Sequence, residues 1–500
     1  MNKSKKRIHI IAAAGIILAG ILIVNCAKIK QNKIDDRILS VEQGLRPAMY
    51  AAGKPVPAMN INERMAHHKV HGLSVAVIHK GKVEWEKGYG VVAAESQDSV
   101  TSETLFQAAS ISKPVAALAA LHLVERGELD MDIPVNQQLR SWKVPENEFT
   151  KEEKVTLRRL LNHTAGLTVH GFPGYHTEAE QPAVVAILDG ESPCNTSPVR
   201  VDKVPGTGWR YSGGGYTVAQ LLMTDILNQP FAEFMKSKIL LPAGMRGSTF
   251  EQPLPPEKAN NAAAGHRSDG NIISGKWHVY PELTAAGLWS TAGDLCRFAV
   301  AVQKAAAGDS ELLTQKTALE MLTPGHGNWG LGPAIAGAGK NRAFSHGGGN
   351  MGYRCQLYAF VENGQGAAVM TNSNHGSDLA AEILRGIASV YDWPAYRAQP
   401  VTVIDLPEDS LTQFTGDFRY DPQPQLSFMV TLNNGRLLIS SPPVGELNLV
   451  PVSRTEFVEL NNGYRVSFIA NDKGKYNRMK AVPFDASMEL LFTRKEVLEE

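Results

Sequence analysis

The chain has 500 residues, of which 43% are hydrophobic and 20% are charged, and its formal net charge is zero. This length allows about three domains, and the hydrophobic content is ordinary for a globular protein with large cores. The sequence has no block of basic residues beyond its N-terminus, which argues against a nucleic-acid partner.

The N-terminus has the pattern of a targeting segment. Lys3, Lys5, Lys6 and Arg7 precede an almost wholly apolar run over residues 8–24. This pattern is typical of a signal sequence or a signal anchor, and Cys26 shortly after the run also allows a lipoprotein signal. We therefore expect residues 1–27 to be a signal peptide, a membrane anchor or a lipoprotein signal. Each of these exports the rest of the chain to the periplasm or the cell envelope.

The remaining cysteines show no pattern of a metal site. Cys194, Cys296 and Cys355 are odd in number and widely spaced, and the last two lie in apolar segments where buried thiols are expected. The histidines at positions 67, 68 and 71 lie near a predicted helix end, where a surface or capping role is favoured over metal binding. We expect neither a metal nor a cofactor.

The first part of the exported chain is predicted to contain a linker, a helix and a β-hairpin. Residues 28–57 are polar and irregular, and we place the linker at residues 28–44. A helix is expected at residues 60–68. An apolar strand is expected at residues 73–79 and a second strand at residues 83–87, on either side of the turn at residues 80–82, which predicts a β-hairpin.

The next segment holds a candidate nucleophile. Ser110 and Lys113 are three residues apart, and an apolar, alanine-rich helical run follows them as far as Gly127. Residues three apart on a helix share one face, so the two side chains can touch. A desolvated lysine has a lowered pKa and can take the serine proton, while a helix N-terminus favours a developing oxyanion. A Ser-x-x-Lys pattern occurs by chance about once in a chain of this length, so its meaning depends on other groups.

The following region mixes helices and strands. Residues 155–270 combine short helices with many glycine and proline loops. Helices are expected at residues 295–306 and 379–391, and a second hairpin at residues 355–361 and 366–371 turns at Asn-Gly. Strands therefore open and close this region while helices fill its middle, so strands from both ends can form one antiparallel sheet.

The composition changes after Pro394. Residues 400–500 contain short alternating runs that are separated by turns such as Asn433–Gly435. The runs are residues 426–432, 436–439, 447–451, 457–460, 464–469 and 479–483. This pattern predicts a small all-β domain of the barrel type, with a packing or gating role.

Two glycine-rich segments offer the other groups that a Ser/Lys site needs. Trp209–Tyr216 carries Tyr211 in a glycine-rich turn before an apolar helix at residues 218–227, and a tyrosine near a lysine can relay a proton. Phe344–Gly352 carries His346 beside a glycine run, where a substrate can approach the backbone and a strand N–H can supply half of an oxyanion hole. Each segment alone is also compatible with a packed loop or a glycine hinge.

The order of these motifs resembles the serine β-lactamase and penicillin-binding-protein superfamily, in particular the class C-like branch that includes esterases and D-aminopeptidases. The motifs are Ser110-x-x-Lys113, Tyr211-Ser212-Gly213 and His346-Gly347-Gly348, with further similar segments at Val155–Leu167, Leu241–Met245, Ala285–Thr291 and Met370–Ser373. The resemblance covers residues 45–395. It implies an α+β fold with an antiparallel sheet flanked by helices and a mostly helical subdomain, followed by the all-β barrel-like domain at residues 400–500.

The resemblance also implies roles for single residues. Ser110 would be the acylated nucleophile, and Lys113 its general base or hydrogen-bond partner. Tyr211 would carry the proton toward the leaving group and help to activate the deacylating water. Gly348 and Gly349 would lie at the substrate, and the backbone N–H groups of Ser110 and Gly349 would form the oxyanion hole.

Two departures from the family pattern bear on the substrate. Position 213 is glycine where the family has an asparagine that binds substrate, and His346 replaces a lysine that helps to hold a substrate carboxylate. A histidine is mostly neutral at pH 7, so we expect weakened carboxylate recognition unless Arg354 supplies the charge. Asn162 and His163 match a family segment that we interpret as structural.

We therefore expect an exported serine hydrolase that forms an acyl-enzyme on Ser110 and acts on an ester or on an amide or peptide, including cell-wall fragments. Two alternatives stay open. A non-hydrolytic or slowly acylating envelope protein of the penicillin-binding type agrees with the missing asparagine, and a true β-lactamase or D-Ala-D-Ala carboxypeptidase would require carboxylate recognition. The expected partners are a small-molecule or peptide substrate and, through residues 1–27, the membrane.

Overall fold

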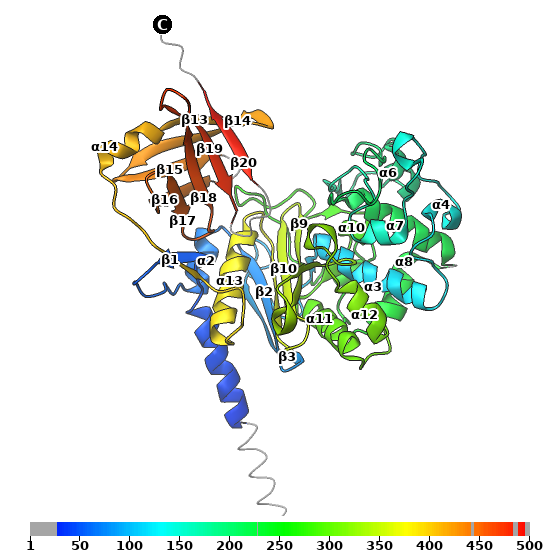
Figure 1. Ribbon diagram of the computed structural model, residues 1–500. Helices are drawn as coiled ribbons and strands as arrows, with labels where there is room; N and C mark the ends of the chain where they lie inside the picture. The colour runs from blue at the N-terminus through cyan, green and yellow to red at the C-terminus, as the bar shows by residue number, and fades with distance from the viewer. Residues whose placement is uncertain (1–27, 228, 442–444, 484–488, 496–500) are drawn as a thin grey trace, which may run out of the picture.

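The computed structural model describes residues 28–227, 229–441, 445–483 and 489–495. It has three parts, which are a central sheet with helices on both faces, a group of helices beside it, and a β-barrel toward the C-terminus (Figure 1). Within these described residues, no helix is long and apolar enough to cross a membrane. The predicted targeting segment at residues 1–27 lies outside them.

The central sheet takes strands from both ends of the domain, as the sequence predicts. The strand order is β3-β2-β11-β10-β9-β8, and all neighbours are antiparallel. Both predicted hairpins, β2–β3 and β10–β11, are confirmed, and β2 pairs with β11 to join them. The strands are β2 (Gly72–His79), β3 (Lys82–Gly90), β8 (Ala334–Ala336), β9 (Ala343–Asn350), β10 (Tyr353–Phe360) and β11 (Gly366–Thr371).

Both faces of this sheet are buried because successive side chains point into two different cores. On β2, Ala76 joins the core under α11 (Ala292–Ala307), while Val75 joins the core under α13 (Gly376–Val390). Helix α11 packs on β2, β3 and β11, and α13 packs on β10 and β11. Both helices lie where the sequence predicts them.

The group of helices surrounds α3 (Ser112–Glu125), which is buried on all sides over most of its length. Its alanine, leucine and valine residues form no single apolar stripe, which is the pattern of a core helix. It is in contact with α7, α10 and α12. The helices of this part are α4 (Val135–Gln138), α5 (Leu157–Leu161), α6 (Val184–Asp189), α7 (Gly213–Ile226), α8 (Phe231–Phe234), α9 (Pro256–Ala259), α10 (Leu283–Ala286) and α12 (Gln315–Met321).

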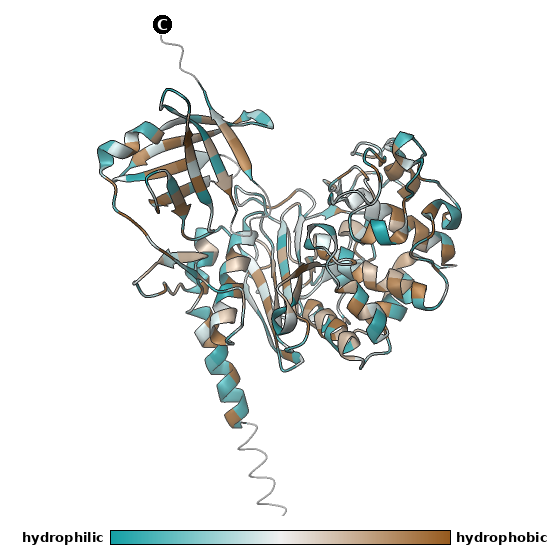
Figure 2. Cartoon of the chain, in the orientation of Figure 1, coloured by the Kyte–Doolittle hydropathy of each residue, from teal (hydrophilic) through white to brown (hydrophobic). Residues whose placement is uncertain are grey.

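Residues 28–42 are helical, so the prediction of an irregular linker at residues 28–44 was wrong over most of its length. Ile34, Ile38 and Val41 recur every three or four residues and pack against the core under α13. Apart from the half-exposed Leu39, the side chains between them are polar, which gives the helix a mostly hydrophilic surface (Figure 2). The polar composition hid a narrow apolar stripe, and packing of that stripe stabilises the helix.

The segment after this helix ties the sheet domain to the barrel. Helix α2 (Ile61–His67) is confirmed within the predicted residues 60–68, with Asn60 as its N-cap. The preceding strand β1 (Met49–Ala51) pairs in parallel with β12 (Gln399–Val401), just before the barrel. Met49 also joins a small apolar cluster that includes Val458 of the barrel.

The C-terminal domain is a closed antiparallel barrel, as predicted. Each of the six predicted runs lies on one of its strands, and the first and last strands, which the sequence did not predict, pair with each other to close it. The strands are β13 (Gly416–Tyr420), β14 (Gln423–Asn433), β15 (Arg436–Ser441), β16 (Gly445–Pro451), β17 (Glu456–Glu459), β18 (Arg465–Ala470), β19 (Tyr476–Val482) and β20 (Leu490–Arg494). The short helix α14 (Glu408–Leu411) precedes them.

Candidate active site

A strained turn presents Ser110 at the start of α3. The turn spans Ala109–Ile111, and Ala109 has a φ of 49°. This left-handed conformation is unfavourable for a residue with a Cβ, and backbone strain of this kind is concentrated at functional sites. Ala109 and Ile111 are buried, while Ser110 between them is partly exposed. The turn therefore directs the serine hydroxyl outward.

Lys113 lies in the first turn of α3, and its amine is buried next to Ser110. Its Nζ is 3.1 Å from Ser110 Oγ and 2.7 Å from the carbonyl oxygen of Ala285 in α10. Burial lowers the pKa of Lys113 to about 7. At neutral pH about half of the molecules then carry a neutral amine, which can donate to Ala285 and accept from Ser110.

Tyr211 approaches the same pair from the N-terminus of α7. Its hydroxyl is hydrogen-bonded to Ser110, and the centre of its ring is 4.9 Å from Lys113 Nζ. Burial raises the pKa of Tyr211 above its ordinary value, although the hydrogen bond to Ser110 acts in the opposite direction. The phenol therefore keeps its proton at neutral pH. The structure thus brings the three predicted catalytic side chains together.

The sequence had suggested that the glycines after Tyr211 form a turn, but in the structure they lie inside α7. Ser212 caps the helix, because its Oγ accepts a backbone N–H of the first turn at 2.9 Å. A Cβ added at Gly213 would lie 3.0 Å from the ring of Phe172 and 3.1 Å from the carbonyl oxygen of His170. The loop that contains these two residues occupies the space where an asparagine at position 213 would begin.

The glycine run at residues 344–352 forms most of β9, at an open edge of the sheet. Strand β8 pairs with β9 only as far as Ser345, so residues 346–350 have β10 on one side and none of the described strands on the other. Alternate N–H groups on such an edge point away from the partner strand and are free to bind a ligand. A Cβ at Gly348 would lie 2.3 Å from the carbonyl oxygen of Ala108, so only glycine lets β9 lie this close to the Ser110 turn. The oxyanion role of Gly349 stays a prediction.

His346 is buried beside this edge, with 4% of its surface exposed. Burial and the neighbouring Lys113 lower its pKa to about 3, against the effect of its hydrogen bond to Gly347. Its Nδ1 donates to the carbonyl oxygen of Gly347 at 2.6 Å, so Nε2 of the neutral ring is an acceptor. This Nε2 has no hydrogen-bond partner among the described residues.

Arg354, the other candidate for carboxylate recognition, is bonded to the main chain. Its Nη1 donates to the carbonyl oxygens of Asn350 and Tyr353, at 2.7 Å in each case. These two bonds hold the guanidinium at the β9–β10 turn. The neutral His346 therefore supplies no positive charge on this side of the site, and Arg354 is held at the turn by two main-chain bonds from Nη1.

The structure also shows a cluster of aromatic rings around Tyr211 that the sequence did not reveal. The ring centres of His163, His170 and Trp329 lie 4.3, 4.9 and 5.7 Å from that of Tyr211. Trp209 packs on Trp329, with ring centres 5.4 Å apart, and is 38% exposed. The sequence signal for this cluster was the segment that contains His163, which we had interpreted as structural.

The comparisons with known proteins agree with this geometry. The sequence profile of the family described as Beta-lactamase matches residues 58–392. The chain belongs to the β-lactamase family. The family and the fold that the motifs predict are therefore confirmed, and membership makes the chain a serine hydrolase.

Relatives of this β-lactamase-family protein have several names. A penicillin-binding protein of Bacillus subtilis (strain 168) is 23% identical over 428 residues, covering 78% of this chain and 88% of that protein. Esterase EstB of Burkholderia gladioli is 28% identical over 198 residues, covering 38% of this chain and 49% of the esterase. The solved octameric penicillin-binding protein homologue from Pyrococcus abyssi has a TM-score of 0.56 at 22% identity, covering 87% of this chain and 98% of that one.

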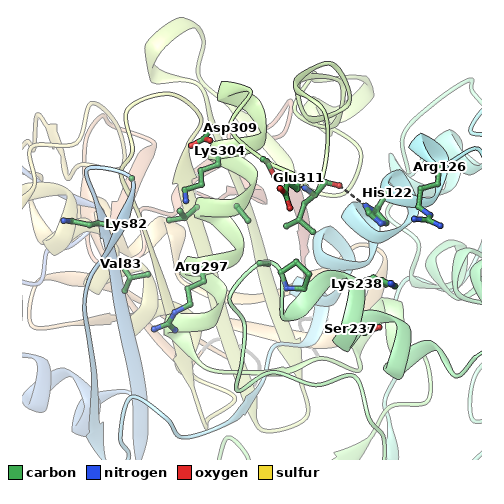
Figure 3. Close-up of a pocket in the computed structure, with 17 residues that line it drawn as sticks. Lys82, Val83, His122, Arg126, Ser237, Lys238, Arg297, Lys304, Asp309 and Glu311 are labelled. Atoms are coloured by element: carbon green, nitrogen blue, oxygen red, sulfur yellow. Dashed lines mark hydrogen bonds between the residues drawn. The ribbon is translucent and has the colours of Figure 1, made fainter.

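The domain also has a hollow of about 910 Å³, shown in Figure 3, and Ser110 is not among the residues that line it. Its lining includes Lys82, Lys304 of α11, and His122 and Arg126 at the far end of α3. Helix α3 has 14 residues and is therefore about 20 Å long, with Ser110 before its other end. The hollow is thus separate from the Ser110 site of the β-lactamase-family domain.

Proposed function

We propose that this β-lactamase-family protein hydrolyses an ester or an amide through an acyl-enzyme on Ser110. The observation that carries the proposal is a buried amine 3.1 Å from a partly exposed hydroxyl, with the pKa of the amine lowered to about 7. A neutral amine at this distance can take the hydroxyl proton while the oxygen attacks a carbonyl carbon. This pairing supplies what acyl transfer needs when no histidine serves as base.

The proton then follows a short path through Tyr211. As the Ser110 Oγ–carbon bond forms, Lys113 accepts the serine proton and becomes an ammonium group. The neutral phenol of Tyr211 donates its proton to the departing alcohol or amine and is reprotonated from Lys113. Water attacks the acyl group by the reverse path, which releases the acid and restores the Ser110 hydroxyl.

The charge distribution supports a substrate that is not selected by a carboxylate. His346 is neutral because of burial and the nearby Lys113, and Arg354 donates to main-chain carbonyls. Gly213 offers no side-chain amide. A substrate that binds through its acyl carbonyl and through contacts with Trp209 and Trp329 fits these surroundings better than a penicillin or a D-Ala-D-Ala terminus.

A labelling experiment tests the nucleophile. A fluorophosphonate probe is expected to form a covalent adduct on Ser110, located by peptide mapping, and Ser110→Ala is expected to abolish it. Ser112→Ala is the matched control, because Ser112 lies two residues away and, among the described residues, its hydroxyl bonds only to the backbone of Ala109 and Leu288. An adduct on another residue, or none, refutes the proposal.

A substrate comparison tests the specificity. We expect measurable turnover of p-nitrophenyl esters or D-amino-acid amides, and much slower turnover of the β-lactam nitrocefin. The substrates are compared at equal concentration, and the rate measured with Ser110→Ala is subtracted as background. Efficient hydrolysis of nitrocefin contradicts the preference for substrates without a recognised carboxylate.

One observation favours a second function, that of a penicillin-binding envelope protein that is acylated but turns over slowly. The missing amide at Gly213, whose space is filled by the loop at His170, removes a substrate contact that the family has. Such a protein would take up one equivalent of probe or penicillin on Ser110 and release product in a single burst. Continuous turnover of an ester decides against it.

We also propose that residues 1–27 export the domain and attach it to the membrane or the cell envelope. The basic cluster before residue 8 and the apolar run to residue 24 support this. Fractionation of cells that express the full chain tests it, because the protein is expected in the envelope fraction. Deletion of residues 1–27 is expected to leave it in the cytoplasm, and Cys26→Ala separates lipid attachment from an anchoring helix.

A further inference from the structure

His163 holds the backbone of Tyr211 from both sides. The carbonyl oxygen of His163 accepts the N–H of Arg210 at 2.9 Å, and its Nδ1 accepts the N–H of Ser212 at 3.1 Å. Its ring lies against that of Tyr211, with centres 4.3 Å apart and 32° between the planes. One residue therefore fixes the positions before and after Tyr211 and covers one face of its ring.

This arrangement is unfavourable for His163 itself. Its φ is 62°, in the left-handed region that residues other than glycine seldom adopt. The residue is 2% exposed, and because Nδ1 accepts a hydrogen bond, Nε2 carries the proton of the neutral ring. This Nε2 has no hydrogen-bond partner among the described residues. Backbone strain and an unpaired buried donor both destabilise a fold, so their coincidence here indicates a functional constraint.

The His163 ring is also held neutral. Burial lowers its pKa well below the ordinary value, and the nearby Lys113, His346 and His170 lower it further. A neutral ring keeps Nδ1 as the acceptor for Ser212. It also avoids a second positive charge beside Lys113, whose neutral form is the base.

We infer that His163 is a positioning residue that sets the Tyr211 hydroxyl against Ser110 and Lys113. His163 acts through Tyr211 and not on the reacting atoms. The inference rests on the proposed function, because the position of Tyr211 matters to turnover only if Ser110 is acylated. It replaces the purely structural interpretation that the sequence favoured for this segment.

Two substitutions separate positioning from folding. His163→Gly removes the Nδ1 acceptor and the ring, and glycine adopts a φ of 62° without strain. His163→Asn also tolerates this backbone and places its Oδ1 where Nδ1 was. The concentration of active sites in both proteins is first measured by titration with the fluorophosphonate probe. The value of kcat is then calculated per labelled Ser110, so that unfolded molecules are not counted.

We expect kcat per labelled site to fall about 100-fold in His163→Gly, the effect of a misplacement of about 1 Å, while KM for a p-nitrophenyl ester stays within about threefold. In His163→Asn, kcat is expected to return to within about fivefold of the wild type, because one good hydrogen bond to Ser212 is restored. The midpoint pH at which kcat/KM falls on the acidic side of its pH profile is expected to be the same in both variants as in the wild type, since the replaced ring is neutral.

The opposite results overturn the inference. The first is a kcat per labelled site in His163→Gly that equals that of the wild type, and the second is a His163→Asn variant as slow as the glycine variant. The third is that the fall in kcat/KM at low pH disappears in both variants, which would make His163 the titrating base. A labelled, active wild type with a fully active glycine variant refutes this inference alone. A wild type that leaves Ser110 unlabelled refutes the proposed function and the inference together.

Discussion

The buried amine of Lys113 makes the pH dependence of turnover a direct test of the site. Burial lowers its pKa from 10.5 to about 7, which disfavours the charged form by about 5 kcal/mol. At pH 7 an ordinary lysine is neutral in about one molecule in 3,000, whereas Lys113 is neutral in about one in two. Desolvation therefore raises the amount of the basic form by about three orders of magnitude.

The assay is kcat/KM for a p-nitrophenyl ester between pH 5 and pH 9. Because kcat/KM reports the pKa of the free enzyme, it should rise about tenfold per pH unit at low pH and level off around a midpoint near 7. Lys113→Arg keeps the positive charge but has no neutral form, so we expect a loss of about 10²- to 10⁴-fold at every pH and no such limb. A profile that is flat from pH 6 to pH 8, or a midpoint above 9, refutes Lys113 as the general base.

Three further substitutions extend the test. Tyr211→Phe removes the proton donor, so turnover of an anilide should fall about 10²- to 10⁴-fold while an ester with the good leaving group p-nitrophenolate loses less; equal losses contradict the relay. Gly348→Ala places a Cβ 2.3 Å from the carbonyl oxygen of Ala108, so β9 must move away from Ser110 and kcat should fall about 100-fold, measured per labelled site. Burial raises the pKa of Glu282 to about 8 from 4.5. The folded protein therefore keeps a proton that the unfolded chain releases, and stability falls by up to about 5 kcal/mol as pH rises from 4.5 to 8. Urea unfolding of Glu282→Gln at pH 5 and pH 8.5 should lack this fall, and an unchanged fall assigns it to another group.

The sequence predicted the elements whose side chains alternate or repeat strongly. Strand β2 is an apolar run, β3 after the turn alternates apolar and charged residues, and the buried helix α3 is mostly apolar. Strand β9 escaped notice because three consecutive glycines carry no side chains from which a period can be read. It becomes a strand by pairing with β10, which lies later in the chain.

The helix at residues 28–42 and two barrel strands were missed for related reasons. The apolar stripe of the helix is narrow, and the core on which it packs includes residues of α13 that are more than 300 residues away in the chain. Strands β13 and β20 are five residues each, too short for a clear period. Each pairs with its neighbour in the chain, β14 or β19, and the two pair with each other to close the barrel. Long-range pairing of this kind is not encoded in a local pattern.

The candidate site divides in the same way. Ser110 and Lys113 could be paired from their spacing alone, because one helical turn brings them together, and Tyr211 followed from the order of the motifs. Two other features could not be predicted from the sequence, because they arise from tertiary packing. They are the left-handed φ of Ala109 and the hydrogen bond from Lys113 to the carbonyl oxygen of Ala285. The hold of His163 on Tyr211 likewise requires two loops to meet.

Burial is the main reason why the site can hold a base and an acid at the same pH. The packing of α3, α7 and α10 excludes water, which disfavours every charged form. It therefore lowers the pKa of Lys113 and of His346 and raises that of Tyr211. Near neutral pH the amine of Lys113 is neutral in about half of the molecules, the imidazole of His346 is uncharged and the phenol of Tyr211 keeps its proton. Among these three groups Lys113 alone changes charge near pH 7, so a second limb between pH 6 and pH 8 would mean that a group outside this set takes part in turnover.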